Sequence, residues 1–238
     1  MKVLLIIPAY NEEKNVKSVY ESICSFNEGN SDGYDCLFIN DGSGDNTEQV
    51  LESCGAEHIR LIQNLGIGGA VQTGYRYAYG HGYDIAVQMD GDGQHDVRYV
   101  KDIIEPIERG EADLVIGSRF VESSSSRFKS SFLRRLGIKI ISAVIRLKTG
   151  KTIFDTTSGF RAVNRKLMKE FAENYPDEYP EPVSSVSALK GGFRVSEVPV
   201  EMHERTAGVS SIRAWKNLYY MVDVIISVML LRGKDGGR

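Results

Sequence analysis

The residues most suited to chemistry are two aspartates, Asp90 and Asp92, which follow directly after an apolar run over residues 85–89. In α/β proteins, ligands bind outside the carboxyl ends of strands, so side chains at this position are candidates for a functional site. Gly91 and Gly93 allow the backbone to turn so that both carboxylates can face one point. Paired carboxylates there suit a divalent cation that also holds a phosphate. A solvated acidic turn is the alternative interpretation, because aspartate and glycine are common turn residues.

The elements that must position these aspartates alternate along the first half of the chain. Near-continuous apolar runs are typical of strands buried on both faces of a parallel sheet, and they occupy residues 3–7, 36–39, 59–62, 85–89 and 114–116. Helical patterns lie between them at residues 12–26, 47–53, 68–79 and 97–108. This alternation predicts an α/β fold with a mostly parallel central sheet flanked by helices.

The second half of the chain is organised differently. A serine run ending at Ser126 predicts a loop, and a basic helix with an apolar face is expected over residues 132–148. A turn-rich stretch at residues 155–161 leads into a helix over 165–173, and residues 193–199 are expected to form a late strand. We therefore predict one domain with a C-terminal elaboration.

Composition places the chain among ordinary soluble globular proteins, because 42% of its 238 residues are hydrophobic and 26% are charged. Its net charge of −3 conceals a basic segment over residues 119–151. This segment contains nine lysines and arginines and one acidic residue, Glu122, so its net charge is +8. Such a segment favours an anionic partner: phosphate, nucleic acid or a membrane surface. A solvated helix face is the alternative. Interleaved aromatic platforms are missing, so nucleic acid is not an expected partner.

The three cysteines, Cys24, Cys36 and Cys54, have no metal-type spacing and are expected to be reduced thiols in the cytoplasm. The apolar run over residues 3–7 is too short for a signal peptide and is expected to be a strand.

The last helical pattern, over residues 212–232, contains an apolar run at residues 218–231 that Asp223 interrupts. Fourteen helical residues extend for about 21 Å, which is short of a hydrocarbon core of roughly 30 Å. This helix could be buried, could form an oligomer contact, or could lie in a membrane interface, flanked by Trp215, Lys216, Arg232 and Lys234.

Six motifs in a fixed order carry a resemblance to a known family. They are PAYNEE at residues 8–13, NDGS at 40–43, NLGIGGA at 64–70, DGDGQH at 90–95, GSRF at 117–120 and DTTSGFR at 155–161. The chain resembles the family 2 glycosyltransferases of GT-A fold, and within them the polyprenyl-phosphate glycosyltransferases such as the dolichyl-phosphate mannose synthases. The resemblance covers residues 1–210, which leaves a C-terminal helix and tail over residues 211–238.

The resemblance implies a donor site for a nucleotide sugar and a divalent metal, Mg²⁺ or Mn²⁺. The metal site would carry over to Asp90, Asp92 and Gln94, with Asp92 also in a catalytic role. A metal ion there would neutralise the charge on the departing diphosphate. The nucleotide pocket would carry over to Pro8, Tyr10, Glu12 and Asp41, with Gly68 permitting close backbone approach. A turn or helix-start explanation serves equally well for that glycine.

The acceptor decides the subclass. A phosphate monoester is already anionic at neutral pH, so an enzyme that uses one needs cations to hold the acceptor, and Arg119 and Arg135 fit this need. A sugar hydroxyl would instead need a carboxylate base, for which Glu181 is the candidate. Arg161 could face the diphosphate or could organise its turn with Asp155. The weak evidence for a base favours the phosphate acceptor.

Two further features concern the donor. Members of the family usually have two aspartates at the end of the second strand. This chain has Asn40 in the first position and keeps the second aspartate as Asp41. Relatives close the late region, residues 201–211, over the diphosphate, so His203 and Arg205 are predicted phosphate contacts. A surface loop is the alternative.

The resemblance, together with the cations available to hold an acceptor phosphate, implies an inverting transferase that moves a hexose from a nucleotide sugar to a polyprenyl phosphate such as undecaprenyl phosphate. A UDP-sugar is favoured, and GDP-mannose remains an option. Transfer to a sugar hydroxyl of a cell-surface glycan and a non-catalytic sugar-nucleotide-binding subunit are the alternatives. The protein is expected in the cytoplasm, peripheral to the inner face of the membrane, and a small membrane-protein partner or a homo-oligomer could anchor it.

Overall fold

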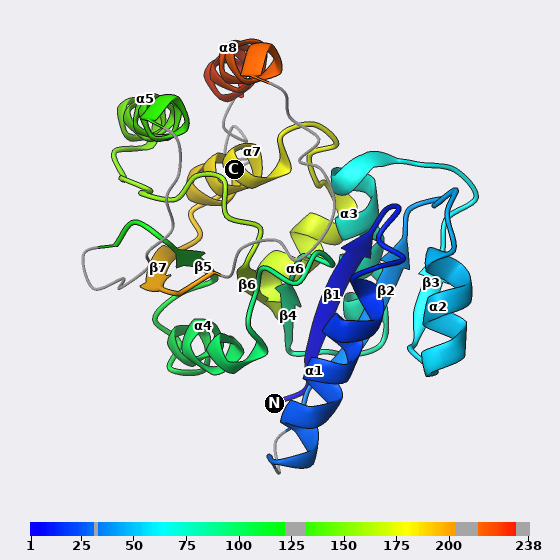
Figure 1. Ribbon diagram of the computed structural model, residues 1–238. Coiled ribbons are helices and arrows are strands. Elements are labelled where there is room, and N and C mark those ends of the chain that lie inside the picture. Colours follow the sequence, from blue (N-terminus) through cyan, green and yellow to red (C-terminus); the bar gives the residue numbers. More distant parts are fainter. Residues whose placement is uncertain (31–32, 122–131, 203–213, 232–238) are drawn as a thin grey trace.

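The computed structural model describes residues 1–30, 33–121, 132–202 and 214–231 (Figure 1). A seven-stranded sheet forms its centre, built from β1 (Val3–Ala9), β2 (Asp35–Asn40), β3 (His58–Arg60), β4 (Ile85–Gln88), β5 (Leu114–Ser118), β6 (Arg161–Asn164) and β7 (Val195–Pro199). The strand order is β3-β2-β1-β4-β6-β5-β7. β6 is antiparallel to both of its neighbours, whereas the remaining pairs are parallel. The predicted mostly parallel sheet is confirmed.

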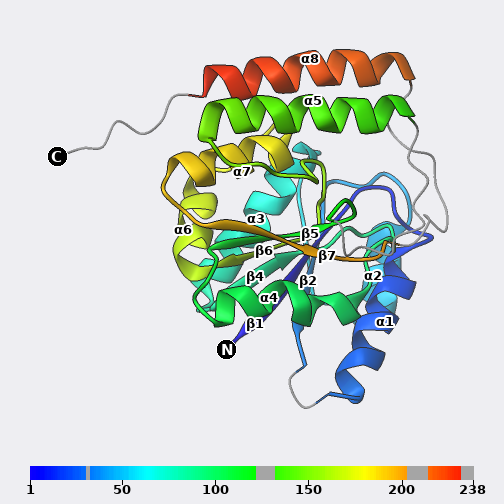
Figure 2. The same cartoon turned by 90° about the vertical axis from the view of Figure 1, so that its left-hand side faces the viewer.

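Helices cover both faces of this sheet (Figures 1 and 2). Their bounds are α1 Val16–Glu28, α2 Thr47–Cys54, α3 Gly66–Gly80, α4 Val100–Glu108 after a 3₁₀ turn Val97–Tyr99, α5 Phe132–Thr149, α6 Arg165–Glu173, α7 Pro180–Lys190 and α8 Ala214–Leu230. One face packs mainly on α1 and α4, and the other on α3, α6 and α7. Figure 2 shows α5 and α8 side by side, as an outer layer beyond α7.

The strands are apolar on both sides because both faces are covered. In β1, Leu4 and Ile6 pack toward α3, whereas Leu5 and Ile7 pack toward α1. Helix α3 lies so close to β1 that a Cβ on Gly74 would be 2.2 Å from Ile6 Cγ2. The near-continuous apolar runs therefore reflect burial on both faces of the sheet, as expected.

The sheet topology creates the crevice in which ligands bind in such folds. From β1 the chain crosses to β2 on one side, and it later returns to β4 on the other side of β1. The carboxyl ends of these three parallel strands therefore meet at one edge, at a reversal of strand order. This edge brings together the segments after Ala9, Asn40 and Gln88.

The predicted elements are found within a few residues of their expected bounds, with two additions. The turn-rich stretch continues into β6, which was not predicted as a strand, and the segment Pro180–Lys190 forms α7, which was not predicted as a helix. The late strand begins at Val195, two residues after the predicted start at Phe193.

One of the expected roles of the C-terminal helix, burial, is observed in part, whereas an oligomer contact and a membrane interface stay predictions. Val224 and Val228 of α8 are buried in the core that α8 shares with α5 and α7, while Ile226 is 48% exposed on the outer side. Across the described helices, none combines the length and the apolar character needed to cross a bilayer. The predicted domain limit at residue 210 lies outside the described residues.

Candidate active site

A cavity of about 530 Å³ opens at the carboxyl edge of the sheet, within the usual range for small-molecule sites. Its lining comes from the ends of β1, β2 and β4, the start of α3 and the first turn of α7: Pro8, Ala9, Tyr10, Glu12, Asp41, Asn64, Gly66, Ile67, Ala70, Asp90, Gly91, Asp92 and Glu181. The structure thus brings together Pro8, Tyr10, Glu12, Asp41, Asp90, Asp92 and Glu181, all of which were predicted from the sequence.

Asp41 is fixed at the end of β2 by the start of α3. Its carboxylate accepts a hydrogen bond of 2.7 Å from the Leu65 N–H, and its carbonyl accepts one of 3.2 Å from Asn64 Nδ2. Burial raises the pKa of Asp41, and the N–H groups of Leu65 and Gly66 oppose that rise. The wall of the cavity therefore presents a rigid carboxyl group that is largely shielded from water.

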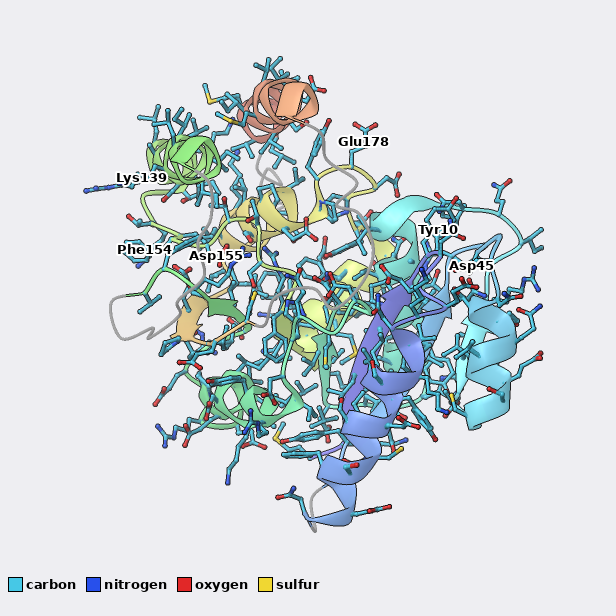
Figure 3. The ribbon with its side chains drawn as sticks, in the orientation of Figure 1. Tyr10, Asp45, Lys139, Phe154, Asp155 and Glu178 are labelled. Atoms are coloured by element: carbon cyan, nitrogen blue, oxygen red, sulfur yellow. The ribbon has the colours of Figure 1, made fainter. Side chains whose placement is uncertain are left out.

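The end of β1 supplies the wall beside Asp41. Tyr10 is half exposed and lies at the top of β1 in Figure 3. Glu12 is held by its own segment, because Glu12 Oε2 accepts a 2.6 Å hydrogen bond from Asn15 Nδ2 and the Glu12 N–H donates to Thr47 Oγ1 at 2.9 Å. This tie to Thr47 connects the β1 wall to the segment that follows β2.

The turn after β4 is ordered by His95, to which the sequence analysis assigned no role. The Asp90 N–H donates to His95 Nδ1 at 2.9 Å, and His95 Nε2 lies 3.6 Å from Asp90 Oδ2. The imidazole stacks on Phe160, with the ring centroids 4.9 Å apart. Burial lowers the pKa of His95 to about 4, so the ring is neutral and its Nε2–H faces the Asp90 carboxylate. The position of His95 at the end of the acidic motif was the one sequence feature that could have indicated this role.

The donor set of this turn fits a hard divalent cation. Asp90 and Asp92 both line the cavity and offer carboxylate oxygens. The turn is cradled closely, because a Cβ on Gly91 would be 2.8 Å from the Pro8 carbonyl oxygen and one on Gly159 would be 2.6 Å from Asp90 Oδ1. Gln94 donates its N–H to Asp92 Oδ1 at 3.0 Å, and its side chain does not line the cavity.

Arg119 forms a buried ion pair rather than projecting freely from the end of β5. Arg119 Nε lies 2.7 Å from Asp155 Oδ2, and Nη2 lies 2.8 Å from Oδ1. Neither side chain has appreciable exposure, at 6% for Arg119 and 0% for Asp155. Glu197 of β7 in turn accepts the N–H groups of Phe154 and Asp155. The expected contact of Arg119 with an acceptor phosphate stays a prediction.

Arg161 organises the start of α7 instead of pairing with Asp155. Its guanidinium is buried and donates from Nη1 to the Glu181 carbonyl at 2.7 Å and to the hydroxyls of Ser184 and Ser185 at 3.0 and 3.1 Å. This anchor sets the position of Glu181 at the cavity wall. Burial raises the pKa of the Glu181 carboxyl, and the nearby Arg161 charge opposes that rise.

Two sequence features receive structural explanations that need no ligand. A Cβ on Gly68 would lie 2.3 Å from the Pro176 carbonyl oxygen, so glycine lets α3 pack against the segment before α7. Asn40 donates from Nδ2 to Glu48 Oε2 and accepts the Ser43 N–H at 3.0 Å. An aspartate at position 40 would face the Glu48 carboxylate, which explains the departure from the usual pair.

Three predicted residues cannot be placed. His203 and Arg205 lie outside the described residues, and the Arg135 side chain lies outside the described part of α5. Their predicted contacts with phosphate groups stay predictions.

Comparison with known proteins reveals similarity in sequence and in fold. A family model described as glycosyl transferase family 2 matches residues 4–171. A UDP-N-acetylglucosamine–dolichyl-phosphate N-acetylglucosaminyltransferase from Methanococcus voltae is 32% identical over 219 residues, which cover 84% of each chain. A polyprenol monophosphomannose synthase from Mycolicibacterium smegmatis is 29% identical, over 89% of this chain and 81% of that protein.

Among solved structures, a glucosyl-3-phosphoglycerate synthase from Mycobacterium tuberculosis in complex with Mn²⁺, UDP and phosphoglyceric acid superimposes with a TM-score of 0.71. The match covers 96% of this chain and 77% of that one at 21% sequence identity. A likeness at this identity is one of fold.

Proposed function

Because this chain belongs to glycosyl transferase family 2, we propose that it transfers a hexose from a nucleotide sugar to a polyprenyl phosphate. The observation that carries the proposal is the single cavity in which Asp41, Asp90 and Asp92 meet from the ends of neighbouring strands. The relatives from Methanococcus voltae and Mycolicibacterium smegmatis, whose names specify a dolichyl-phosphate and a polyprenol acceptor, support a lipid phosphate as the acceptor.

The donor nucleotide is assigned to the side of the cavity formed by β1 and β2. Asp41 offers a buried carboxylate to a base N–H, and Pro8 and Tyr10 form the wall beside it. We propose a UDP-sugar as the donor, with GDP-mannose as the second choice. Because the Leu65 N–H already holds this carboxylate, Asp41 would lose little conformational entropy when the nucleotide binds.

The diphosphate is assigned to the turn after β4. Asp90 and Asp92 would hold Mn²⁺ or Mg²⁺, whose chemistry when bound is to neutralise charge on the leaving diphosphate. His95 keeps the Asp90 backbone in place and presents Nε2–H to its carboxylate. Gly159 leaves the space that this carboxylate needs.

The acceptor phosphate would attack the anomeric carbon from the face opposite the diphosphate, and the configuration at that carbon would invert. Because a phosphate monoester is already anionic at neutral pH, no protein base is needed. A second candidate, a glycan hydroxyl, is favoured by one observation: Glu181 lines the cavity, and burial raises its pKa toward the range of a general base.

The lipid acceptor would reach the site from a membrane that α5 and α8 contact, and we propose the inner face of the cell membrane as that surface. Asp223, the acidic residue in the apolar run of α8, accepts a 3.1 Å hydrogen bond from the Tyr179 hydroxyl. Lys139 and Arg146 of α5 are exposed, and Lys139 points away from the body of the molecule (Figure 3). Apolar side chains are exposed on both helices: Leu136, Ile140, Leu147, Val222, Ile226, Met229 and Leu230. Exposed apolar groups beside cations are typical of interfacial helices.

Incubation of the purified chain with Mn²⁺, a panel of UDP- and GDP-sugars and a short polyprenyl phosphate tests the reaction, with mass spectrometry to detect glycolipid. We expect one donor to give a lipid-phosphate-sugar. Asp92→Asn should abolish the product, and Asp102→Asn, at an exposed position in α4, should not.

Glu181→Gln separates the two acceptors. This variant should retain transfer to the lipid phosphate, whereas it should nearly abolish transfer to a sugar hydroxyl. Hydrolysis of the donor without any glycolipid, in every donor of the panel, would refute the lipid acceptor.

A further inference from the structure

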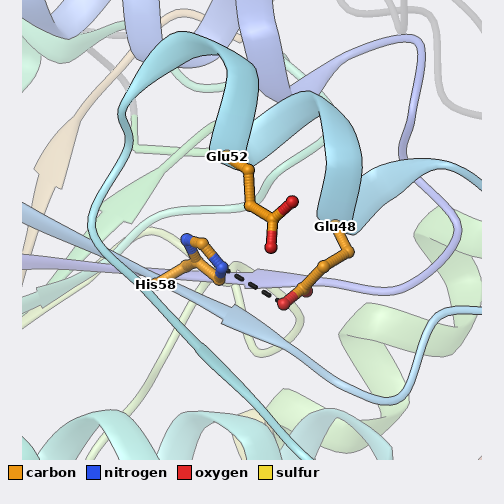
Figure 4. Close-up of side chains that lie close together, drawn as sticks. All are labelled: Glu48, Glu52 and His58. Atoms are coloured by element: carbon orange, nitrogen blue, oxygen red, sulfur yellow. Dashed lines mark hydrogen bonds and ion pairs between the residues drawn. The ribbon is translucent and has the colours of Figure 1, made fainter.

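Glu48, Glu52 and His58 form a cluster outside the cavity, between α2 and the edge strand β3 (Figure 4). Glu48 and Glu52 lie one turn apart on α2, so both carboxylates project from the same face of the helix. Their oxygens and a ring nitrogen of His58 all lie within 4.8 Å of one another. None of these residues lines the proposed donor site.

The hydrogen bonds of His58 fix which ring nitrogen carries the hydrogen. Nδ1 lies 2.8 Å from the carbonyl oxygen of Ala56, and a carbonyl can only accept, so Nδ1 is the donor. Nε2 lies 3.2 Å from Glu48 Oε1. On a neutral imidazole, the Nε2 lone pair would therefore face a carboxylate oxygen, acceptor against acceptor. A proton or a cation is needed between them: a second ring proton, a proton on the Glu48 carboxyl, or a metal ion.

The surrounding contacts resemble the support that metal ligands receive from their neighbours. A ligating histidine generally donates its other N–H to a carbonyl or carboxylate, as His58 does to Ala56, and ligating carboxylates are themselves hydrogen-bonded. The second oxygen of Glu48 accepts a hydrogen bond from the Asn40 amide. This contact orients Glu48 while leaving Oε1 directed at the imidazole.

We propose that Glu48, Glu52 and His58 bind Zn²⁺ as a site separate from that of Asp90 and Asp92. One imidazole and two carboxylates suit zinc, whereas an all-oxygen set suits Mg²⁺ or Mn²⁺. The Glu52 side chain is exposed and can rotate to shorten the spacing. The ion would neutralise the two carboxylates and would tie α2 to β3. Through Asn40 it would also support the strand end that carries Asp41.

Titration of the full chain with Zn²⁺ after chelator treatment tests this site, with calorimetry for stoichiometry and thermal unfolding as the second readout. We expect Asp92→Asn to retain one zinc equivalent, and Glu52→Gln and His58→Gln to lose it. The loss of a direct ligand should weaken binding by more than the roughly 10–100-fold typical of an outer partner. Because Glu52 is exposed, its variant should fold normally.

His81→Gln is the matched control, because His81 Nδ1 also lies 2.8 Å from a carbonyl oxygen, that of Tyr77. This variant should bind zinc as the parent chain does, and Zn²⁺ should raise the Tm of both. The same zinc stoichiometry in the parent, His58→Gln and Glu52→Gln chains would overturn the proposal. So would nuclear magnetic resonance evidence that His58 carries both ring protons in the presence of excess Zn²⁺.

Discussion

Gly159→Ala should damage the reaction while leaving the fold intact. Gly159 lies in the turn before β6, and its φ is outside the left-handed region, so the backbone accepts alanine. The added Cβ would be 2.6 Å from Asp90 Oδ1, whereas ordinary contact begins at 3.4 Å, so the carboxylate must move by about 0.8 Å. Because the Asp90 side chain is 35% exposed, its carboxylate can move into the cavity without disturbing the core.

A displacement of this size at a reacting centre slows the reaction. A misplacement of about 1 Å can reduce a rate by about 10²-fold, and we expect a loss of that order in kcat/KM together with a higher Mn²⁺ requirement. The free energy of unfolding should change by no more than ~1 kcal/mol, since the clash is relieved at the end of a side chain. Glycolipid formation across a Mn²⁺ series and urea unfolding measure the two effects.

Gly80→Ala provides the control for this experiment. Gly80 is the last residue of α3, and no heavy atom lies within 4 Å of the position of its Cβ. Alanine there should leave the activity unchanged and should raise the stability by up to roughly 1 kcal/mol. An unaltered Mn²⁺ dependence in Gly159→Ala would refute the assignment of Asp90 to the metal.

Other expectations follow from burial and charge. Asp155→Asn leaves the Arg119 charge buried without its counter-ion, so urea unfolding should show a loss of about 3–5 kcal/mol. Burial lowers the pKa of His95 to about 4 from the ordinary 6.5, so between these values the unfolded chain binds a proton that the folded chain does not. The free energy of unfolding should therefore fall as the pH is lowered through this window, and His95→Gln should flatten the fall. Ile226→Asp should weaken vesicle binding by at least about 10-fold, because a buried aliphatic side chain contributes about 1.5–3 kcal/mol.

Matched surface changes separate these effects from general damage. Arg109→Ala breaks an exposed ion pair with Glu105 and should cost no more than ~1 kcal/mol. Ile62→Asp alters a fully exposed isoleucine away from α5 and α8, and it should leave vesicle binding unchanged. Equal losses in the two members of either pair would contradict the reasoning.

The sequence indicated the first half of the fold well, because strands buried on both faces leave long apolar runs. β6 lacks that signal: it has four residues, and its first residue, Arg161, belongs to the stretch at residues 155–161 that was predicted as turn-rich. The Arg161 side chain can be buried because its guanidinium donates hydrogen bonds to groups distant in the sequence, the carbonyl of Glu181 and the hydroxyls of Ser184 and Ser185. Helix α7 was missed because its buried face mixes those serines with Val183 and Val186, so no regular apolar stripe marks it in the sequence.

For the site, strand ends predicted which residues meet but not how each is held. The glycosyltransferase family and its fold are confirmed, and the residues expected at the ends of β1, β2 and β4 do line one cavity. The pairing of Arg119 with Asp155 and the role of His95 depend on side-chain geometry between separate segments. Neither residue type nor spacing specifies such contacts.

The antiparallel course of β6 has a consequence for how this fold can change. The chain leaves the sheet after β5 and returns at β6 beside it, and the Gly117 N–H donates to the Phe160 carbonyl at 2.8 Å where the excursion closes. Because its two ends are already joined, each doubling of the excursion's length would cost only about 0.6 kcal/mol in closure entropy. Insertions and exchanges between these strands can thus accumulate while the sheet stays intact.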